Sequence, residues 1–330
     1  MLFMFKKSFI AFLLTTVVIY GMCVLIYKIP PYELIVYSKN ILRDILFQDL
    51  KNSSWQNAKK YIKIASTIDD LPNIRSHDEG YSFYIAGHTY GKPGAESNGL
   101  YDPFTEKFYM INNYHSMKFG FLLGDVVREA SNDAGQLVKK DLNSLDPRIR
   151  NIIVPGNHDV GTGANNTKRD IFLQQFGKTF FSFKHGKDLF IALDGNISEW
   201  NISGEQLQFL KQSLPNKKDS TGNIFIFSHQ LIWQNSSKSE FKKIKPNSLE
   251  GRSNNLNFWN EVFPLFTDLT NNVYFFSGDI GAFPNGNELF YTKYLNATFV
   301  ATGMGGGMRD NFLIVSVIKG HVEIFFVPIN

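Results

Sequence analysis

The chain has 330 residues, of which 43% are apolar, so it can form one large domain or two small ones around a sizeable core. Lys and Arg number 34 against 30 for Asp and Glu. This net charge of +4 is too small to favour nucleic-acid binding, which we do not expect. The sole cysteine, Cys23, excludes an intrachain disulfide. If the chain lies outside the cytoplasm, this absence fits a bacterial envelope protein better than a secreted eukaryotic one.

The first segment with a clear prediction is residues 8–27, which carry no charge. A helix of this length spans about 30 Å, the thickness of the bilayer's hydrocarbon core, so we predict a single-pass transmembrane signal-anchor. Lys6 and Lys7 favour a cytoplasmic N-terminus at residues 1–7, with the rest of the chain on the periplasmic side of a bacterial inner membrane. Lys28 weakens this orientation. A cleaved signal peptide is the competing interpretation, although its apolar region is normally about 7–15 residues long.

Residues 28–79 are predicted to form a helical stalk and linker in front of a domain at residues 80–330. Apolar residues recur at helical spacing over residues 32–65. Such a helix either lies on the membrane or pairs with a protein partner, or it packs on the domain. Residues 66–80 are polar and include a Leu-Pro pair, which is typical of a linker.

Five short runs rich in β-forming residues each end near a side chain that can bind a metal. The runs are residues 81–85 before His88, 119–123 before Asp125, 152–154 before Asn157, 224–227 before His229, and 273–276 before Asp279. Ligands of open α/β sheets lie beyond the carboxyl ends of the strands. Parallel neighbouring strands would therefore bring these five side chains together at one edge of a sheet.

Helices and further strands alternate with these runs, which predicts the α/β class. Helices are expected at residues 126–145, 168–176 and 204–214, and strands at 180–185, 189–193, 297–301, 311–318 and 321–327. Two long insertions, residues 90–117 and 231–255, leave strand ends on the edge described above and could shape a substrate pocket. The second insertion is basic, and a solvated charged loop is its alternative interpretation.

Several motifs occur in an order that resembles the calcineurin-like metallophosphoesterases, a family that includes the purple acid phosphatases. These motifs are Gly124-Asp125, Gly156-Asn157-His158-Asp159, the lone His229, and a glycine-rich stretch at residues 301–307. The resemblance covers roughly residues 80–328. It implies a four-layer αββα sandwich of two mixed sheets flanked by helices. Two family motifs are altered, because Ala86 replaces an aspartate, Asp279 replaces the first histidine of the last motif, and Gly281 replaces the second.

The resemblance also implies a divalent metal. One ion would be held by Asp125, Asn157, His229 and Asp279, with Asp125 in the position that bridges two ions. Mixed nitrogen and oxygen ligands suit Mn, Fe or Zn, and the charge of Asp279 favours Mn or Fe. A second ion would keep only His88 and the shared Asp125. One tightly held ion is the preferred outcome. The alternatives are a weakly bound second ion, or a replacement carboxylate from Asp78, Glu79 or Asp102.

Catalysis would use a metal-activated water as nucleophile and His158 as the acid that protonates the leaving group, a role suited to histidine. Asp159 could orient the His158 ring, and His88 would point at the phosphate or at the water. Alternatively, His158 and Asp159 only bind backbone groups of their loop. The expected function is membrane-anchored hydrolysis of a phosphomonoester or phosphodiester substrate. The alternative is a catalytically degenerate metal-binding scaffold in a cell-envelope complex.

Overall fold

The computed structural model describes residues 61–72, 80–94, 99–112, 117–216, 222–235, 237–241, 244–283, 288–307 and 309–329. The chain divides into two compact units, Met1–Ser53 and Ser54–Asn330, and every described residue belongs to the second. The expected anchor at residues 8–27 and most of the expected stalk and linker at residues 28–79 lie outside the described residues. Within the described ranges, no helix combines the length and the apolar character needed to cross a bilayer.

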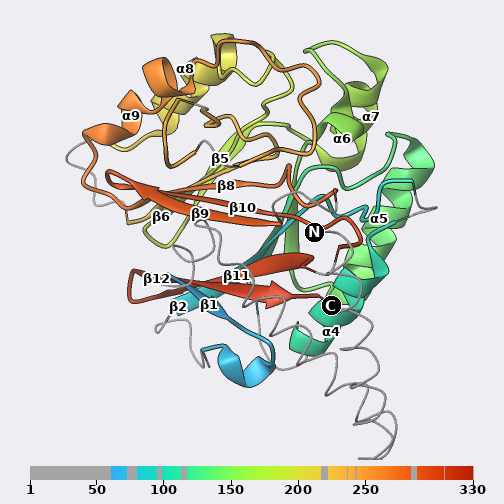
Figure 1. The fold of residues 1–330 in the computed structure, drawn as a ribbon. Helices are drawn as coiled ribbons and strands as arrows, with labels where there is room; N and C mark the ends of the chain where they lie inside the picture. Colours follow the sequence, from blue (N-terminus) through green and yellow to red (C-terminus); the bar gives the residue numbers. More distant parts are fainter. Residues whose placement is uncertain are drawn as a thin grey trace, which may run out of the picture. The chain divides into compact units, whose positions relative to one another are not determined.

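Two mixed sheets form the centre of the second unit (Figure 1). The first sheet has the order β1-β12-β11-β2-β3-β4. Its strands are β1 (Ile62–Ile64), β2 (Gly80–Gly87), β3 (Phe119–Leu123), β4 (Arg150–Val154), β11 (Asn311–Ile318) and β12 (His321–Pro328). Strands β2, β3 and β4 run parallel to one another, and β11 is antiparallel to β2. The carboxyl ends of β2, β3 and β4 therefore meet at one edge.

The second sheet has the order β5-β6-β7-β8-β10-β9. Its strands are β5 (Phe181–His185), β6 (Asp188–Ala192), β7 (Ile224–Ser228), β8 (Val273–Ser277), β9 (Leu289–Tyr294) and β10 (Ala297–Thr302). The four strands β6, β7, β8 and β10 are parallel, and the edge strands β5 and β9 are antiparallel to their neighbours. The strands β2, β3, β4, β7 and β8 thus end within two residues of the predicted positions.

The helices are connectors between these strands. They are η1 (Ile68–Asp70), α4 (Asp102–Asn112), α5 (Asn132–Leu145), α6 (Asn157–Val160), α7 (Thr167–Phe176), α8 (Gly204–Ser213), η2 (Phe258–Val262) and α9 (Pro264–Thr267). In Figure 1, α4 and α5 lie beside the first sheet, whereas α8 and α9 lie on the far side of the second.

An aromatic layer fills the space between the two sheets. The rings of Phe121 on β3 and Phe227 on β7 stack with centroids 3.7 Å apart. Phe83 on β2 contacts Phe190 and Phe225 of the second sheet at 5.5 and 5.4 Å. Because side chains alternate along a strand, the intervening residues of β2 and β3 face the helices instead.

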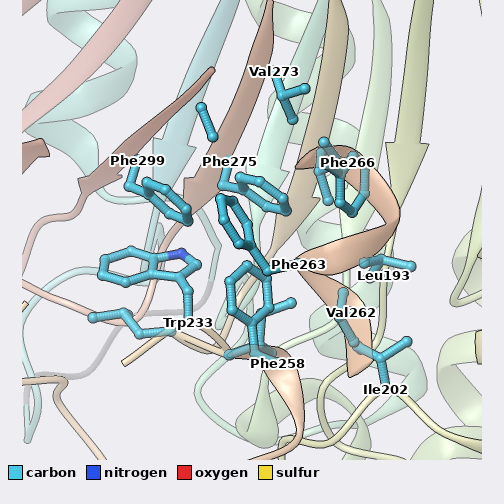
Figure 2. Close-up of a cluster of buried hydrophobic side chains, with 14 of the residues drawn as sticks. Leu193, Ile202, Trp233, Phe258, Val262, Phe263, Phe266, Val273, Phe275 and Phe299 are labelled. Carbon is cyan, nitrogen blue, oxygen red and sulfur yellow. The ribbon is translucent and has the colours of Figure 1, made fainter. Parts of the chain in front are cut away.

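Two further apolar cores lie on the outer faces of the sheets. On the first sheet, Phe104 and Phe108 of α4 pack with Val138 and Leu142 of α5. On the second sheet, Trp233, Phe258 and Phe263 pack over Phe275 and Phe299 (Figure 2). Helices thus cover the outer face of each sheet, which is the layer order expected from the sequence.

Two predicted helices are wrong at their ends. Residues 62–64, expected to be helical, form β1, which gains backbone partners from β12. The first sheet therefore includes residues upstream of 80. Helix α5 begins at Asn132, after the N-cap Ser131, rather than at residue 126. The N–H groups of Val126 and Val127 instead donate to the Asp159 carboxylate, so these residues do not start a helix.

Candidate metal centre

The polar side chains that follow five parallel strands converge, but they come from two sheets and not from one. His88, Asp125 and Asn157 follow β2, β3 and β4, whereas His229 and Asp279 follow β7 and β8. Direct bonds join the two sets. Between the sets, His229 Nδ1 lies 2.8 Å from the Leu123 carbonyl oxygen at the end of β3. Within the second set, the Asp279 N–H donates to the His229 carbonyl at 3.0 Å.

Asp125, His229 and Asp279 form a group that could hold a metal ion, with one ligand atom from each within 4.8 Å of the others. His229 Nε2 lies 3.3 Å from Asp125 Oδ2 and 3.7 Å from Asp279 Oδ1. Asp125 Oδ2 also lies 3.8 Å from His88 Nε2. Asp125 therefore lies between the imidazoles of His229 and His88.

Unpartnered polar atoms in this group fit a bound cation. His229 Nε2 and both carboxylate oxygens of Asp279 are buried and make no hydrogen bond. Buried polar groups without partners are costly and rare. A divalent ion with nitrogen and oxygen ligands would satisfy all three atoms at once. The residues present therefore fit a metal.

Both imidazoles are held so that Nε2 faces the centre. His88 Nδ1 lies 2.8 Å from the Met304 carbonyl oxygen, and His229 Nδ1 lies at the same distance from that of Leu123. A carbonyl accepts a hydrogen bond, so Nδ1 carries a proton in each ring, and Nε2 is the atom that could offer a lone pair to a metal. This arrangement is the usual outer-shell support of metal-ligating histidines.

The loops after β2 and β3 hold strained residues. His88 and Asp125 have φ values of 55° and 51°, in the left-handed region that non-glycine residues rarely adopt. Gly124 precedes Asp125 with φ of 73°, and a Cβ there would lie 2.5 Å from the His229 ring. Glycine is therefore required for β3 and His229 to approach this closely.

Gly156 gives a testable prediction for the metal site. Its φ of −98° is ordinary, but a Cβ would lie 2.2 Å from Asp125 Oδ1. Gly156→Ala should therefore displace Asp125 and weaken Mn²⁺ binding by about tenfold or more, as measured by titration calorimetry. Gly135→Ala in α5, where the nearest atoms belong to the flexible Gln175, is the matched control and should bind Mn²⁺ normally. Equal affinities in the two variants would contradict this role for Asp125.

Asp159 does not orient the His158 ring, as one prediction had it. Its carboxylate accepts the N–H groups of Asp125, Val126, Val127 and Gly156 at 2.8–3.1 Å. Asp159 is 1% exposed, so these bonds tie the loop after β3 to the loop after β4. The alternative interpretation, in which Asp159 binds backbone groups, is the correct one for this residue.

His158 lies at the start of α6 on the rim of the centre. Its N–H donates to Asp125 Oδ1 at 3.1 Å, and its Nδ1 lies 2.6 Å from the Arg128 carbonyl oxygen. Its Nε2 is thus left for a substrate. Asn157 lies between His158 and Gly156, which both contact Asp125, so it is close to the centre; its role as a ligand stays a prediction.

Tyr90 and Asp310 belong to this region, although no sequence pattern indicated them. The Tyr90 ring lies 4.3 Å from the His88 ring and 5.2 Å from the His158 ring, centroid to centroid. Asp310 accepts the N–H groups of Gly305, Gly306 and Gly307 at 2.8–3.1 Å. It thereby shapes the glycine-rich loop, whose Met304 carbonyl orients His88.

The two altered motifs leave few ligands for a second ion. Ala86 is fully buried in the apolar core beneath α4 and α5. Gly281 has φ of 93°, and a Cβ there would lie 2.7 Å from Gly303, so the backbone itself occupies this space. Asp102 does not replace the missing carboxylate, because it is exposed and lines a groove with Glu106 and Asp141. Asp78 and Glu79 lie outside the described residues.

The second insertion packs against the centre, so it is more than a solvated loop. Trp233 and Phe241 are buried in the core of the second sheet. Further along, the Asn247 N–H donates to the Asp279 carbonyl at 2.9 Å, and its side-chain oxygen accepts the N–H of Ala282 at 2.8 Å. The insertion therefore holds the loop that carries Asp279.

The charges of the centre predict that metal binding releases protons. Burial raises the pKa of Asp279 to about 8. Burial lowers the pKa of His229, but the neighbouring Asp125 raises it more, to about 10. Both groups therefore carry protons at pH 7 in the metal-free protein, and both must lose them to bind a metal.

We accordingly expect about two protons released per ion at pH 7, and an apparent affinity that rises steeply as the pH rises from 6 to 8. Titration calorimetry in buffers of different ionisation enthalpy measures this number. Binding without proton release at pH 7 would contradict the assignment of His229 and Asp279 as ligands.

Comparison with known proteins supports the fold. No protein-family model and no curated protein matches the chain. Among solved structures, the purple acid phosphatase PPD1 of yellow lupin (Lupinus luteus) has a TM-score of 0.50 at 13% identity, over 75% of this chain and 53% of that one. A putative 5'-nucleotidase from Staphylococcus aureus has a TM-score of 0.45 at 13% identity, over 76% of this chain and 54% of that one.

A predicted phosphoesterase from Streptococcus pneumoniae has a TM-score of 0.32 at 8% identity, over 76% of this chain and 90% of that one. The chain spans about half the length of the first two structures. Identities this low bear on the fold alone. Together with the two facing mixed sheets and the order of the strand-end motifs, the similarity shows that the chain has the calcineurin-like metallophosphoesterase fold.

Proposed function

We propose that the chain is a metal-dependent phosphoesterase that hydrolyses a phosphomonoester or a phosphodiester. The observation that carries this proposal is the buried group of Asp125, His229 and Asp279, in which three polar atoms lack partners. Asn157 would complete the ligand set. The ligand types favour Mn or Fe, and Zn is the next candidate. When bound, the ion would activate a water molecule and neutralise charge on the phosphoryl group.

The chain's own residues supply the rest of the reaction. Asp125 would hold the ion and also fixes the loop of His158 through the His158 N–H. His158 Nδ1 is engaged by a carbonyl oxygen, which leaves Nε2 to give a proton to the departing oxygen. Asp159 keeps the two loops together, so that Asp125 and His158 keep their positions relative to each other. With few groups left for a second ion, we propose one tightly held metal, with His88 directed at the phosphoryl group or at the water.

We also propose that the enzyme is anchored to a membrane. Residues 8–27 would anchor it in a bacterial inner membrane with the catalytic unit on the periplasmic side, and residues 32–65 could meet a protein partner. The uncharged run and the lysines before it support the anchor. A substrate in the cell envelope would suit this location.

The test uses the full-length protein, freed of metal and reloaded with Mn²⁺, Fe²⁺ or Zn²⁺. We expect metal-dependent hydrolysis of p-nitrophenyl phosphate or bis-p-nitrophenyl phosphate, with one tightly bound ion by elemental analysis. Tight metal binding without turnover of either ester would instead support the metal-binding scaffold. The metal ligands that are missing at Ala86 and Gly281 favour that alternative.

A further inference from the structure

Tyr90 contacts both His88 and His158, and the mechanism above does not use it. It lies in the loop after β2, and its N–H donates to the Asp125 carbonyl at 3.1 Å. Only 4% of the residue is exposed. Its ring lies between the rings of His88 and His158, at centroid distances of 4.3 and 5.2 Å. The aromatic ring is therefore fixed at the centre by its backbone and by both neighbours.

The hydroxyl of Tyr90 has no partner among the described residues, unlike that of Tyr81, which donates to Asp188 at 2.5 Å. Nor is it one of the fully buried atoms that lack a hydrogen bond, so it still opens to solvent. Hydroxyl groups of buried tyrosines usually find an acceptor. Tyr90 thus presents one unused O–H donor beside His88 and His158, where a ligand would lie.

The side of the centre where Tyr90 lies has lost two of the side chains that would hold a second ion, and Arg128 is a positive charge near Tyr90. The positions at which the fold's family pattern carries further metal ligands are Ala86, which is packed in the core, and Gly281, which has no side chain. His88 lies on this side, 3.8 Å from Asp125. A phosphoryl group bound to an ion at Asp125 would therefore have non-bridging oxygens here that need hydrogen-bond donors.

We propose that Tyr90 is a substrate-binding residue whose O–H donates to a non-bridging phosphoryl oxygen on the His88 side of the centre. It takes over part of the charge stabilisation that a second ion would otherwise provide. This inference rests on the proposed phosphoesterase function. Burial raises the pKa of the phenol further above neutrality, so the group acts as a donor and not as a base.

Tyr90→Phe tests the inference, because it removes only the hydroxyl and keeps the ring between the histidines. The probe is inorganic phosphate, titrated calorimetrically into the Mn²⁺-loaded full-length protein. We expect phosphate affinity to fall by about tenfold or more, the usual effect of losing a hydrogen bond to a charged group. KM for p-nitrophenyl phosphate should rise or kcat fall in proportion, while Mn²⁺ content and melting temperature stay unchanged.

Tyr109→Phe is the matched control, because Tyr109 is 55% exposed on α4 and lines no part of the centre. It should bind phosphate like the unmodified protein. The inference is overturned if Tyr90→Phe also binds phosphate normally while Tyr90→Leu loses it, since the ring would then act only by packing. If the unmodified protein hydrolyses no ester and binds no phosphate, the proposed function fails first, and the role of Tyr90 fails with it.

Discussion

His158→Ala is expected to lower kcat by about 10²–10⁴-fold, the usual contribution of a positioned general acid. The loss should be smaller for p-nitrophenyl esters than for alkyl esters, because a good leaving group needs less protonation. Steady-state kinetics on both classes of ester measures this difference. Metal content should not change, because His158 contacts Asp125 through its backbone N–H and not through its ring.

His321→Ala is the matched control for this experiment. His321 is exposed at the start of β12 and should be replaceable without a change in kcat. If His158→Ala lowers the melting temperature but leaves kcat unchanged for both ester classes, the ring serves only to bind the Arg128 carbonyl. Hydrolysis that survives unchanged in every variant would indicate a contaminating enzyme.

Asp159→Ala is expected to give the largest loss of stability of any single substitution near the centre. It removes one carboxylate that accepts four buried N–H groups, from Asp125, Val126, Val127 and Gly156. Each unsatisfied donor costs about 1–3 kcal/mol, so the free energy of unfolding should fall by about 4 kcal/mol or more. In a domain of this size, the melting temperature should drop by about 10 °C, as calorimetry would show.

Asp268→Ala is the control for Asp159, since Asp268 is exposed just after α9 and its loss should change the melting temperature little. Metal binding separates two explanations of the Asp159 effect. If Asp159 only holds the loops after β3 and β4 together, Mn²⁺ should still bind to the variant at low temperature, though more weakly. A melting temperature equal to that of the unmodified protein would show that water replaces the carboxylate without cost.

The sequence was informative about the strands because their signal is local. Runs of phenylalanine and branched residues that stop at glycine or serine predicted β3 to the residue and β2, β4, β7 and β8 to within a few. The side chain that follows each run also indicated the metal centre, since parallel strands present their carboxyl ends together. What the runs could not show is that the ends belong to two sheets, because sheet membership depends on pairings far apart in the chain.

Residues that act through long-range contacts were harder to find. Asp159 was assigned to the wrong partner, because most of the N–H groups that donate to it come from a loop more than thirty positions earlier in the chain. Tyr90 and Asp310 sit in no motif, and their roles depend on rings and amides that only the folded chain brings near. Strand β1 was missed because three residues at a sheet edge carry almost no periodic signal.

Crystallography of the Mn²⁺-loaded protein with anomalous scattering tests the metal assignment most directly. We predict one strongly occupied ion within coordination distance of Asp125, Asn157, His229 and Asp279, with His158 and Tyr90 beside it and not bound to it. An ion held elsewhere, or one that leaves His229 Nε2 and the Asp279 carboxylate without a partner, would contradict this assignment and the catalytic roles built on it.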